Sequence, residues 1–177
     1  DAKNEMGEYL GIVDLGDFIP ESIAMGSYHN CALSTEKQVK CWGRNTAGSL
    51  GYGDEDNRSD DPNEMGNNLS VVDLGDNFEV TELSLGDAFS CALSKDGNVK
   101  CWGEGLRGRL GSESWKDIGT EPGQMGNNLS TIDLGQNFTA KKISAGGQHV
   151  CALSHQGSIK CWGHNWAGQF SPTLYFW

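Results

Sequence analysis

Apolar and polar residues alternate over short stretches of this chain, and the same stretches recur. In residues 80–85, for example, leucines alternate with Glu82 and Ser84. Alternation with a period of two over a short run is typical of half-buried β-strands. Each recurring unit holds two more alternating stretches and one short apolar run, in the second unit at residues 89–94, 99–102 and 68–74. The pattern predicts four strands in each unit and no helix.

The recurring unit is sixty residues long and occurs three times. Cys-Ala-Leu-Ser begins at Cys31, Cys91 and Cys151, and Cys-Trp-Gly begins at Cys41, Cys101 and Cys161. A repeat of this length indicates stacked copies of one supersecondary unit. We divide the chain into three repeats and a short aromatic tail, at residues 1–51, 52–111, 112–171 and 172–177.

The hairpin that joins the two cysteines of each unit can be registered from its turn. Lys95-Asp96-Gly97 fits a three-residue hairpin loop with glycine in the left-handed region. That loop places Cys91 opposite Cys101, at a position where side chains of the two strands lie close together. The first copy has Lys37 where the second has Gly97. We therefore expect a strained turn in the first copy.

The spacing of the cysteines supports one disulfide within each hairpin: Cys31–Cys41, Cys91–Cys101 and Cys151–Cys161. Each bond would contribute about 2–3 kcal/mol by restricting the unfolded chain. Six buried free thiols remain the alternative, because unbonded cysteine packs as a small apolar residue. A zinc site is disfavoured, because the cysteines are ten residues apart and no histidine recurs in all three units.

Paired cysteines point to an oxidising compartment. Four glycosylation sequons agree with this assignment, at Asn57, Asn68, Asn128 and Asn137. We expect a secreted or cell-surface protein, or one in an organelle lumen, whose targeting segment was removed or lies outside this sequence. No stretch is long and apolar enough to span a membrane. A net charge of −11 disfavours nucleic-acid partners, because phosphates are bound by lysine and arginine.

The repeated sequence motifs resemble those of a known protein family. Gly146–Ser154, followed by Gly157–Phe170, resembles the repeat of the regulator of chromosome condensation family. The resemblance implies four-stranded blades of a seven-bladed β-propeller, and the paired cysteines resemble the secreted or surface members. It does not carry over the exchange-factor activity, because the sequence has no match to the insertion on which that activity depends. Similar propellers serve as enzyme inhibitors, adhesins and assembly parts, so the fold does not give the function.

We therefore expect an all-β protein, an open arc of three four-stranded antiparallel blades. Three blades leave two apolar end faces uncovered, which predicts other protein chains as partners, in a homo-oligomer or a larger assembly. A fragment of a longer propeller is the remaining account. The aromatic tail, with Tyr175, Phe176 and Trp177, is a candidate part of the contact, or else a disordered terminus.

Few residues stand out as functional. Trp166 replaces Thr46 and Leu106 of the earlier copies, which makes it a candidate contact residue. His29 and His149 share one repeat position with Phe89, so we interpret them as structural. An acidic loop over residues 53–64 is a weak candidate for calcium, through the carboxylates of Asp54, Asp56, Asp60 and Glu64, and a solvated loop is the better interpretation.

The sequence contains no nucleophile elbow, phosphate-binding loop or zinc-protease motif. We therefore expect a non-catalytic structural or interaction module without a cofactor. The alternative is an enzyme, or a regulator of a GTPase, with its site on the loops of one rim.

Overall fold

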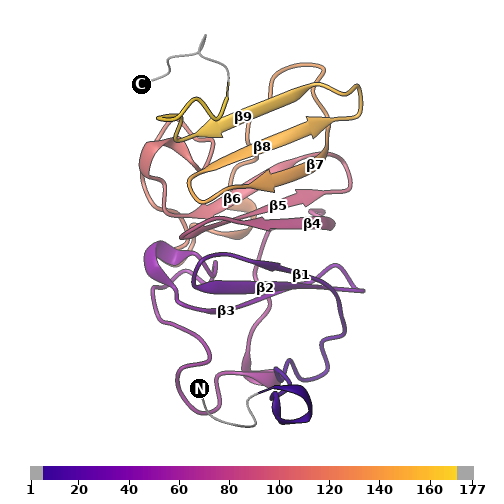
Figure 1. Ribbon diagram of the computed structural model, residues 1–177, viewed down its shortest axis with the longest axis vertical. Coiled ribbons are helices and arrows are strands. Elements are labelled where there is room, and N and C mark those ends of the chain that lie inside the picture. The colour runs from indigo at the N-terminus through magenta and orange to yellow at the C-terminus, as the bar shows by residue number, and fades with distance from the viewer. Residues whose placement is uncertain (1–5, 171–177) are drawn as a thin grey trace.

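The computed structural model describes residues 6–170, and over these residues it consists of three antiparallel sheets of three strands each. Figure 1 shows the sheets stacked one after another along the long axis of the molecule. We call them blades 1, 2 and 3. Their strands are β1 (Pro20–Met25), β2 (His29–Ser34) and β3 (Val39–Gly43); β4 (Val80–Leu85), β5 (Phe89–Ser94) and β6 (Val99–Gly103); β7 (Ala140–Ala145), β8 (His149–Ser154) and β9 (Ile159–Gly163).

Short 3₁₀ turns lie before blade 1 and in the connections between the blades. They are η1 (Gly7–Tyr9), η2 (Thr46–Gly48), η3 (Gly66–Asn68), η4 (Leu106–Gly108) and η5 (Gly126–Asn128). No helix in residues 6–170 is long and apolar enough to cross a membrane.

The register of the cysteine hairpins agrees with the sequence-based prediction. Cys91 pairs with Cys101, and the Ser94 N–H donates to the Asn98 carbonyl at 2.8 Å. In the structure the facing cysteines of every blade are bonded as disulfides, with Cα–Cα distances of 4.0–4.1 Å. The three disulfides indicate an oxidising environment.

The structure lacks the fourth strand that the sequence predicts for each blade in the described residues. The apolar run 68–74 forms no ladder, and each blade therefore has three strands rather than four. The Val72 N–H donates to the Val39 carbonyl at 2.8 Å, which places the run beside β3 of blade 1. Ile132 bonds to Val99 in the same way. The run cannot extend into a ladder, because η3 begins it and an Asp73–Gly75 turn ends it, with the Gly75 N–H 2.8 Å from Asp73 Oδ1.

The hydrophobic core lies between the blades. One buried cluster joins Val39 and the Cys31–Cys41 disulfide of blade 1 to Leu85 and Trp102 of blade 2. A second cluster joins Val99 and the disulfide of blade 2 to Ile143 and Val150 of blade 3. Each blade is thus stabilised by apolar area that only a neighbouring blade can cover.

A buried lysine ties each of the first two blades to the repeat that follows. Lys40 Nζ donates to the carbonyls of Leu15 at 3.1 Å and Gly66 at 2.9 Å, and it lies 5.5 Å from the centre of the Phe18 ring. Lys100 repeats this arrangement with the carbonyls of Leu74 and Gly126. We call it the lysine clasp. Carbonyl acceptors and an aromatic face compensate the buried ammonium group.

The turn of the first hairpin is strained as the sequence predicts, because Lys37 has φ +65°. Lys37→Gly should raise the free energy of unfolding by about 0.5–1 kcal/mol, since only glycine adopts this conformation without steric cost. The lost ion pair to Glu21 is partly exposed and offsets little. Gly157→Lys is the matched control: its φ is +85° with open space around it, so a loss of about 1 kcal/mol is expected in urea denaturation. A destabilised Lys37→Gly protein would contradict the strain.

Candidate protein-interaction surfaces

One rim of the arc gathers aromatic, aliphatic and cationic side chains, with contributions from all three blades. We call it the rim surface and define it by Tyr28, Arg44, Leu106, Arg107, His164 and Trp166. These residues lie just before the middle strand or just after the last strand of a hairpin, and the pairing of His29 with Gly43 brings these two positions to the same edge. The rim surface therefore follows from the hairpin register.

Neighbouring side chains of the rim surface pair within blades 1 and 3 and between blades 2 and 3. The Arg44 guanidinium lies 5.7 Å from the Tyr28 ring, and Arg107 of blade 2 contacts Nε2 of His164. The His164 and Trp166 rings are 6.4 Å apart. Desolvation lowers the pKa of His164, and the charges of Arg107 and Arg109 lower it further. Tyr28 and Trp166 remain 69% and 79% exposed, which leaves large aromatic surfaces open to a partner.

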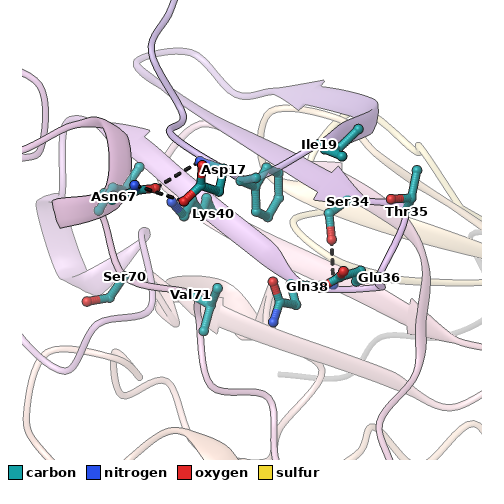
Figure 2. A pocket seen from close by; sticks show the side chains of 12 residues that line it. Asp17, Ile19, Ser34, Thr35, Glu36, Gln38, Lys40, Asn67, Ser70 and Val71 are labelled. Atoms are coloured by element: carbon teal, nitrogen blue, oxygen red, sulfur yellow. Dashed lines mark hydrogen bonds between the residues drawn. The ribbon is translucent and has the colours of Figure 1, made fainter.

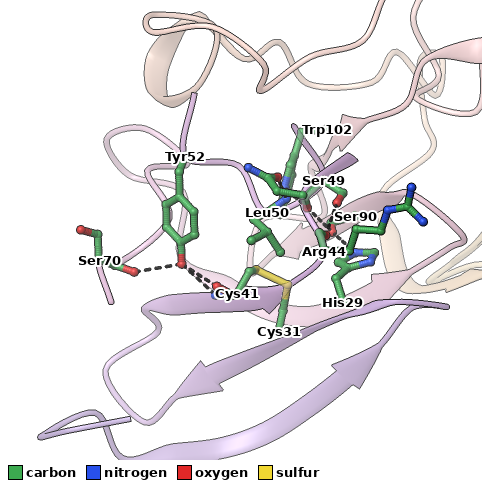
Figure 3. Close-up of a disulfide and its surroundings, with 11 residues drawn as sticks. His29, Cys31, Cys41, Arg44, Ser49, Leu50, Tyr52, Ser70, Ser90 and Trp102 are labelled. Carbon is green, nitrogen blue, oxygen red and sulfur yellow. Dashed lines mark hydrogen bonds between the residues drawn. A yellow bond between two sulfur atoms is a disulfide. The ribbon is translucent and has the colours of Figure 1, made fainter. Parts of the chain in front are cut away.

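A small cavity of about 160 Å³ opens beside the rim surface, between blades 1 and 2. Beneath it, His29 Nε2 lies 2.9 Å from Ser90 Oγ, and both Ser90 Oγ and the Trp102 indole donate to the Ser49 carbonyl. Figure 3 shows this network next to the Cys31–Cys41 disulfide. Burial lowers the pKa of His29 to about 4. A neutral, buried and hydrogen-bonded imidazole holds two blades together.

A hollow with a volume of about 570 Å³ lies beside blade 1, between the turn of its cysteine hairpin and residues 67–71. Figure 2 shows Asp17 and Asn67 facing one another beside Lys40 in this hollow. The Asn67 amide accepts from the Asp17 N–H at 2.8 Å and donates to the Asp17 carboxylate at 3.0 Å, while Lys40 belongs to the lysine clasp. These groups hold the repeats together, so the hollow presents no acid–base or nucleophilic pair among them.

The structure does not bring the weak calcium candidates together. Asp54 pairs with Arg58 at 2.7 Å, and Glu64 Oε2 accepts backbone N–H groups from Ser59, Asp60 and Asp61. Asp60 accepts from the Asn57 amide at 2.9 Å. In residues 6–170 no group of three or more His, Cys, Asp or Glu is arranged to hold a metal ion. The carboxylates order their own loop.

The other predicted site residues fall in different places. The four sequon asparagines, Asn57, Asn68, Asn128 and Asn137, are all exposed. Trp166 lies on the rim surface, whereas Tyr175, Phe176 and Trp177 lie outside the described residues.

Sequence reasoning missed Tyr28 and Arg107, although both differ from the other copies at their repeat positions. This variation between the repeats, at positions along one edge of the arc, was the signal that could have identified the two residues.

Three stacked sheets with a shared core between neighbours define a segment of a β-propeller. The chain belongs to the RCC1 family: the model described as "Regulator of chromosome condensation (RCC1) repeat" matches residues 21–49, 80–109 and 140–169. Each match covers most or all of one sheet and the first turn after it. The resemblance seen in the sequence is thereby confirmed.

Relatives with this repeat are much longer proteins. The chain is 32% identical over 157 residues to the probable E3 ubiquitin-protein ligase HERC6 of Homo sapiens, covering 89% of this chain and 14% of that protein. It is 30% identical over 148 residues to the ultraviolet-B receptor UVR8 of Arabidopsis thaliana, covering 83% and 30%. Among solved structures, Prp20p of Saccharomyces cerevisiae matches with a TM-score of 0.62 and 22% identity, covering 82% of this chain and 33% of that one. The chain therefore spans a third or less of each, and the last match shows the fold alone.

Proposed function

We propose that this chain is a non-catalytic protein-interaction module that works in an extracellular, surface or other oxidising-compartment assembly, and that it binds its partner through the rim surface. The observation that carries the proposal is the rim surface itself. Tyrosine, tryptophan and arginine are enriched at the residues that dominate binding energy in protein interfaces. Here they occupy neighbouring blades of a chain whose net charge is −11.

Two histidines of the described residues make contacts that fit a structural role. His29 is neutral and engaged with Ser90, and His164 contacts Arg107 rather than a carboxylate. A general base needs a partner that orients it toward a substrate. Ser90, the partner of His29, donates its hydroxyl to the Ser49 carbonyl. His164 Nδ1 lies 2.9 Å from the amide oxygen of Gln148, so neither histidine is oriented by a carboxylate.

The proposed setting rests on the disulfides and the exposed sequons. Secretion predicts glycans on at least some of Asn57, Asn68, Asn128 and Asn137, and enzymatic release should lower the mass of the secreted protein. Asn68→Gln removes one sequon without altering the fold, because this side chain is exposed. An unglycosylated protein with six alkylatable thiols would contradict the setting.

The rim surface is tested by comparing two double variants. Leu106→Ala with Trp166→Ala removes exposed apolar area from blades 2 and 3. We expect capture of the partner from the native compartment to weaken by roughly tenfold or more, as for the loss of an interface anchor. Ile19→Ala with His155→Ala is the control, because these exposed residues lie at the opposite rim, near the hairpin turns. Equal capture by both variants would contradict the proposal.

Regulation of a GTPase is the second candidate. Its support is the similarity of the chain to the guanine nucleotide exchange factor SRM1 of Saccharomyces cerevisiae, which is 25% identical over 198 residues. Nucleotide exchange on a small GTPase, lost on substitution at the rim surface, would establish this function instead.

A further inference from the structure

We propose that Asn68 carries an N-linked glycan whose first sugar, N-acetylglucosamine, packs into a hollow between two repeats and stabilises the fold. The inference rests on the proposed oxidising setting, in which sequons become modified, and goes beyond it by giving one glycan a structural role. The hollow shares no residue with the rim surface. The two surfaces can therefore act independently.

Asn68 is held at the surface by its neighbours in the chain. It is the last residue of η3, and the next residue, Leu69, is 2% exposed. Asn68 itself is exposed, and so is Ser70, which completes the sequon. A buried neighbour between two exposed polar residues gives the sequon a fixed place at the surface, where a bulky glycan can be accommodated.

The amide of Asn68 is available for modification, in contrast to the amides of two other sequons. Asn128, its counterpart in the next repeat, donates from Nδ2 to the Gly123 carbonyl at 2.8 Å. Asn57 donates from Nδ2 to the Asp60 carboxylate at 2.9 Å. Within residues 6–170 the Asn68 side chain makes no hydrogen bond. A sugar on Asn68 therefore breaks none of the contacts that hold the described fold.

The modification replaces one hydrogen of the amide by the sugar. Nδ2 of Asn68 forms a bond to C1 of N-acetylglucosamine, and the bond from C1 to the pyrophosphate of a lipid-linked oligosaccharide breaks. The lipid pyrophosphate leaves with the electron pair of that bond, and Nδ2 loses one proton. The amide remains uncharged, so the first sugar is fixed beside Asn68 without a new charge on the side chain.

A hollow with a volume of about 600 Å³ opens beside Asn68. It lies between the connections that follow the last strands of blades 1 and 2, and residues of both connections line it. An added Cβ at Gly53 would lie 3.1 Å from the Glu121 carbonyl oxygen, so the two connections are in contact there. Volumes of several hundred Å³ are typical of sites that enclose a small ligand. The hollow therefore has room for one sugar with its acetamido group.

Tyr52 forms a fixed wall of this hollow. Its hydroxyl accepts from the Cys41 N–H at 3.0 Å and lies 3.1 Å from the Ser70 carbonyl oxygen, as Figure 3 shows. Burial raises the pKa of Tyr52 to about 12, so the hydroxyl keeps its proton. Arg58 lies 5.1 Å from the centre of the ring and pairs with Asp54 at 2.7 Å. A wall that is ordered before the sugar binds loses little conformational entropy.

The hollow offers both kinds of contact that an N-acetylated sugar needs. Val71 is 45% exposed and Met125 is partly buried, so apolar area remains for the acetyl methyl and the C–H groups of the sugar. Asp73 Oδ1 accepts from the Gly75 N–H at 2.8 Å, and this exposed carboxylate can accept further hydrogen bonds from sugar hydroxyls. Covering the apolar area of Val71 and Met125 should stabilise the folded chain.

The test compares trimmed proteins in urea denaturation. The chain is secreted with high-mannose glycans and treated with an endoglycosidase, which leaves one N-acetylglucosamine on each modified asparagine. Mass spectrometry should find this sugar on Asn68. Ser70→Ala removes the sequon, and its unfolding equilibrium constant should be roughly fivefold larger than that of the wild type, as for the loss of a few tens of Å² of buried apolar area.

Ser130→Ala is the matched control, because it makes the same change at the same repeat position and removes the sequon of Asn128. Its unfolding equilibrium constant should equal that of the wild type. Secretion into a bacterial periplasm, which oxidises cysteines without adding these glycans, gives a second comparison. There the wild type and Ser70→Ala should unfold at the same urea concentration. The difference between the trimmed proteins then belongs to the sugar and not to the serine hydroxyl.

Val71→Thr tests the contact with the sugar, since threonine occupies this position in the next repeat. It should leave Asn68 modified and reduce the stabilisation by the sugar, measured between trimmed and periplasmic protein. A bare Asn68 beside another modified sequon, or trimmed wild type and Ser70→Ala of equal stability, would overturn the inference and leave the proposed setting standing. No sugar on any of the four sequons would overturn both.

Discussion

Trp102→Ala should lower the free energy of unfolding by about 3–5 kcal/mol, the range for removing a fully buried large aromatic side chain. Trp102 is 0% exposed and fills the space between blades 1 and 2. Its indole N–H donates to the Ser49 carbonyl at 3.0 Å, and Figure 3 shows it over Leu50 and the disulfide region. The loss combines apolar area, a cavity and a hydrogen bond across the blades.

Trp42→Ala is the matched control for this prediction. Trp42 occupies the same repeat position in blade 1, but it is only partly buried in the described chain because no blade precedes it there. Removing it should cost about half as much or less, since less apolar area returns to water. Urea denaturation of both variants measures the difference. Equal losses would mean that packing between blades does not set the stability of this fold.

Acidification from pH 6.5 to about 4 should remove about 3 kcal/mol of stability through His29, since one pKa unit corresponds to about 1.4 kcal/mol. Burial lowers the pKa of His29 from 6.5 to about 4 in the folded protein. Within this window the unfolded chain binds a proton at His29 and the folded chain does not. Falling pH therefore favours unfolding, and the contribution of His29 is fully present only above pH 6.5.

His29→Phe isolates this effect from the other titrating groups. Phenylalanine already occupies the position in blade 2, where Phe89 is 0% exposed, and Ser90 keeps its hydrogen bond to the Ser49 carbonyl. The difference in unfolding free energy between wild type and variant should change by about 3 kcal/mol between the two pH values. His155→Asn, at an exposed turn, should show no such change. If the difference in unfolding free energy between wild type and His29→Phe did not change with pH, the imidazole of His29 would lie in a solvated site.

Both predictions concern contacts between blades, and the two largest effects therefore depend on residues about sixty positions apart. His29 with Ser90, and Trp102 with Ser49, connect neighbouring repeats. Removing either contact loosens two blades from one another.

The hairpins could be predicted from sequence in detail. Alternation of apolar residues located β5 and β6, the Lys95–Gly97 turn set their register, and that register placed Cys91 opposite Cys101. All of this information is local, because a hairpin joins residues only a few positions apart. The strain at Lys37 followed from the same comparison of turns.

The candidate site was only partly visible in the sequence. Trp166 was found because it differs from its repeat counterparts, but nothing local indicated that Arg107 of the neighbouring blade contacts His164 beside it. From the sequence, the acidic loop was only a weak candidate for a cation, and a solvated loop was the better interpretation. In the folded chain Asp54 binds Arg58 and Glu64 binds backbone N–H groups, an outcome that depends on the path of the loop.

By itself, then, the sequence determined the blades: their number in this chain, their hairpin register and the pairing of their cysteines, since each is encoded within about a dozen neighbouring residues. Only the tertiary structure decided how the blades meet. It placed Val72 beside Val39 of the preceding blade and the Gly66 carbonyl on Lys40. These contacts join different repeats, and a pattern of alternation shows which face of a strand is apolar without showing which partner covers it.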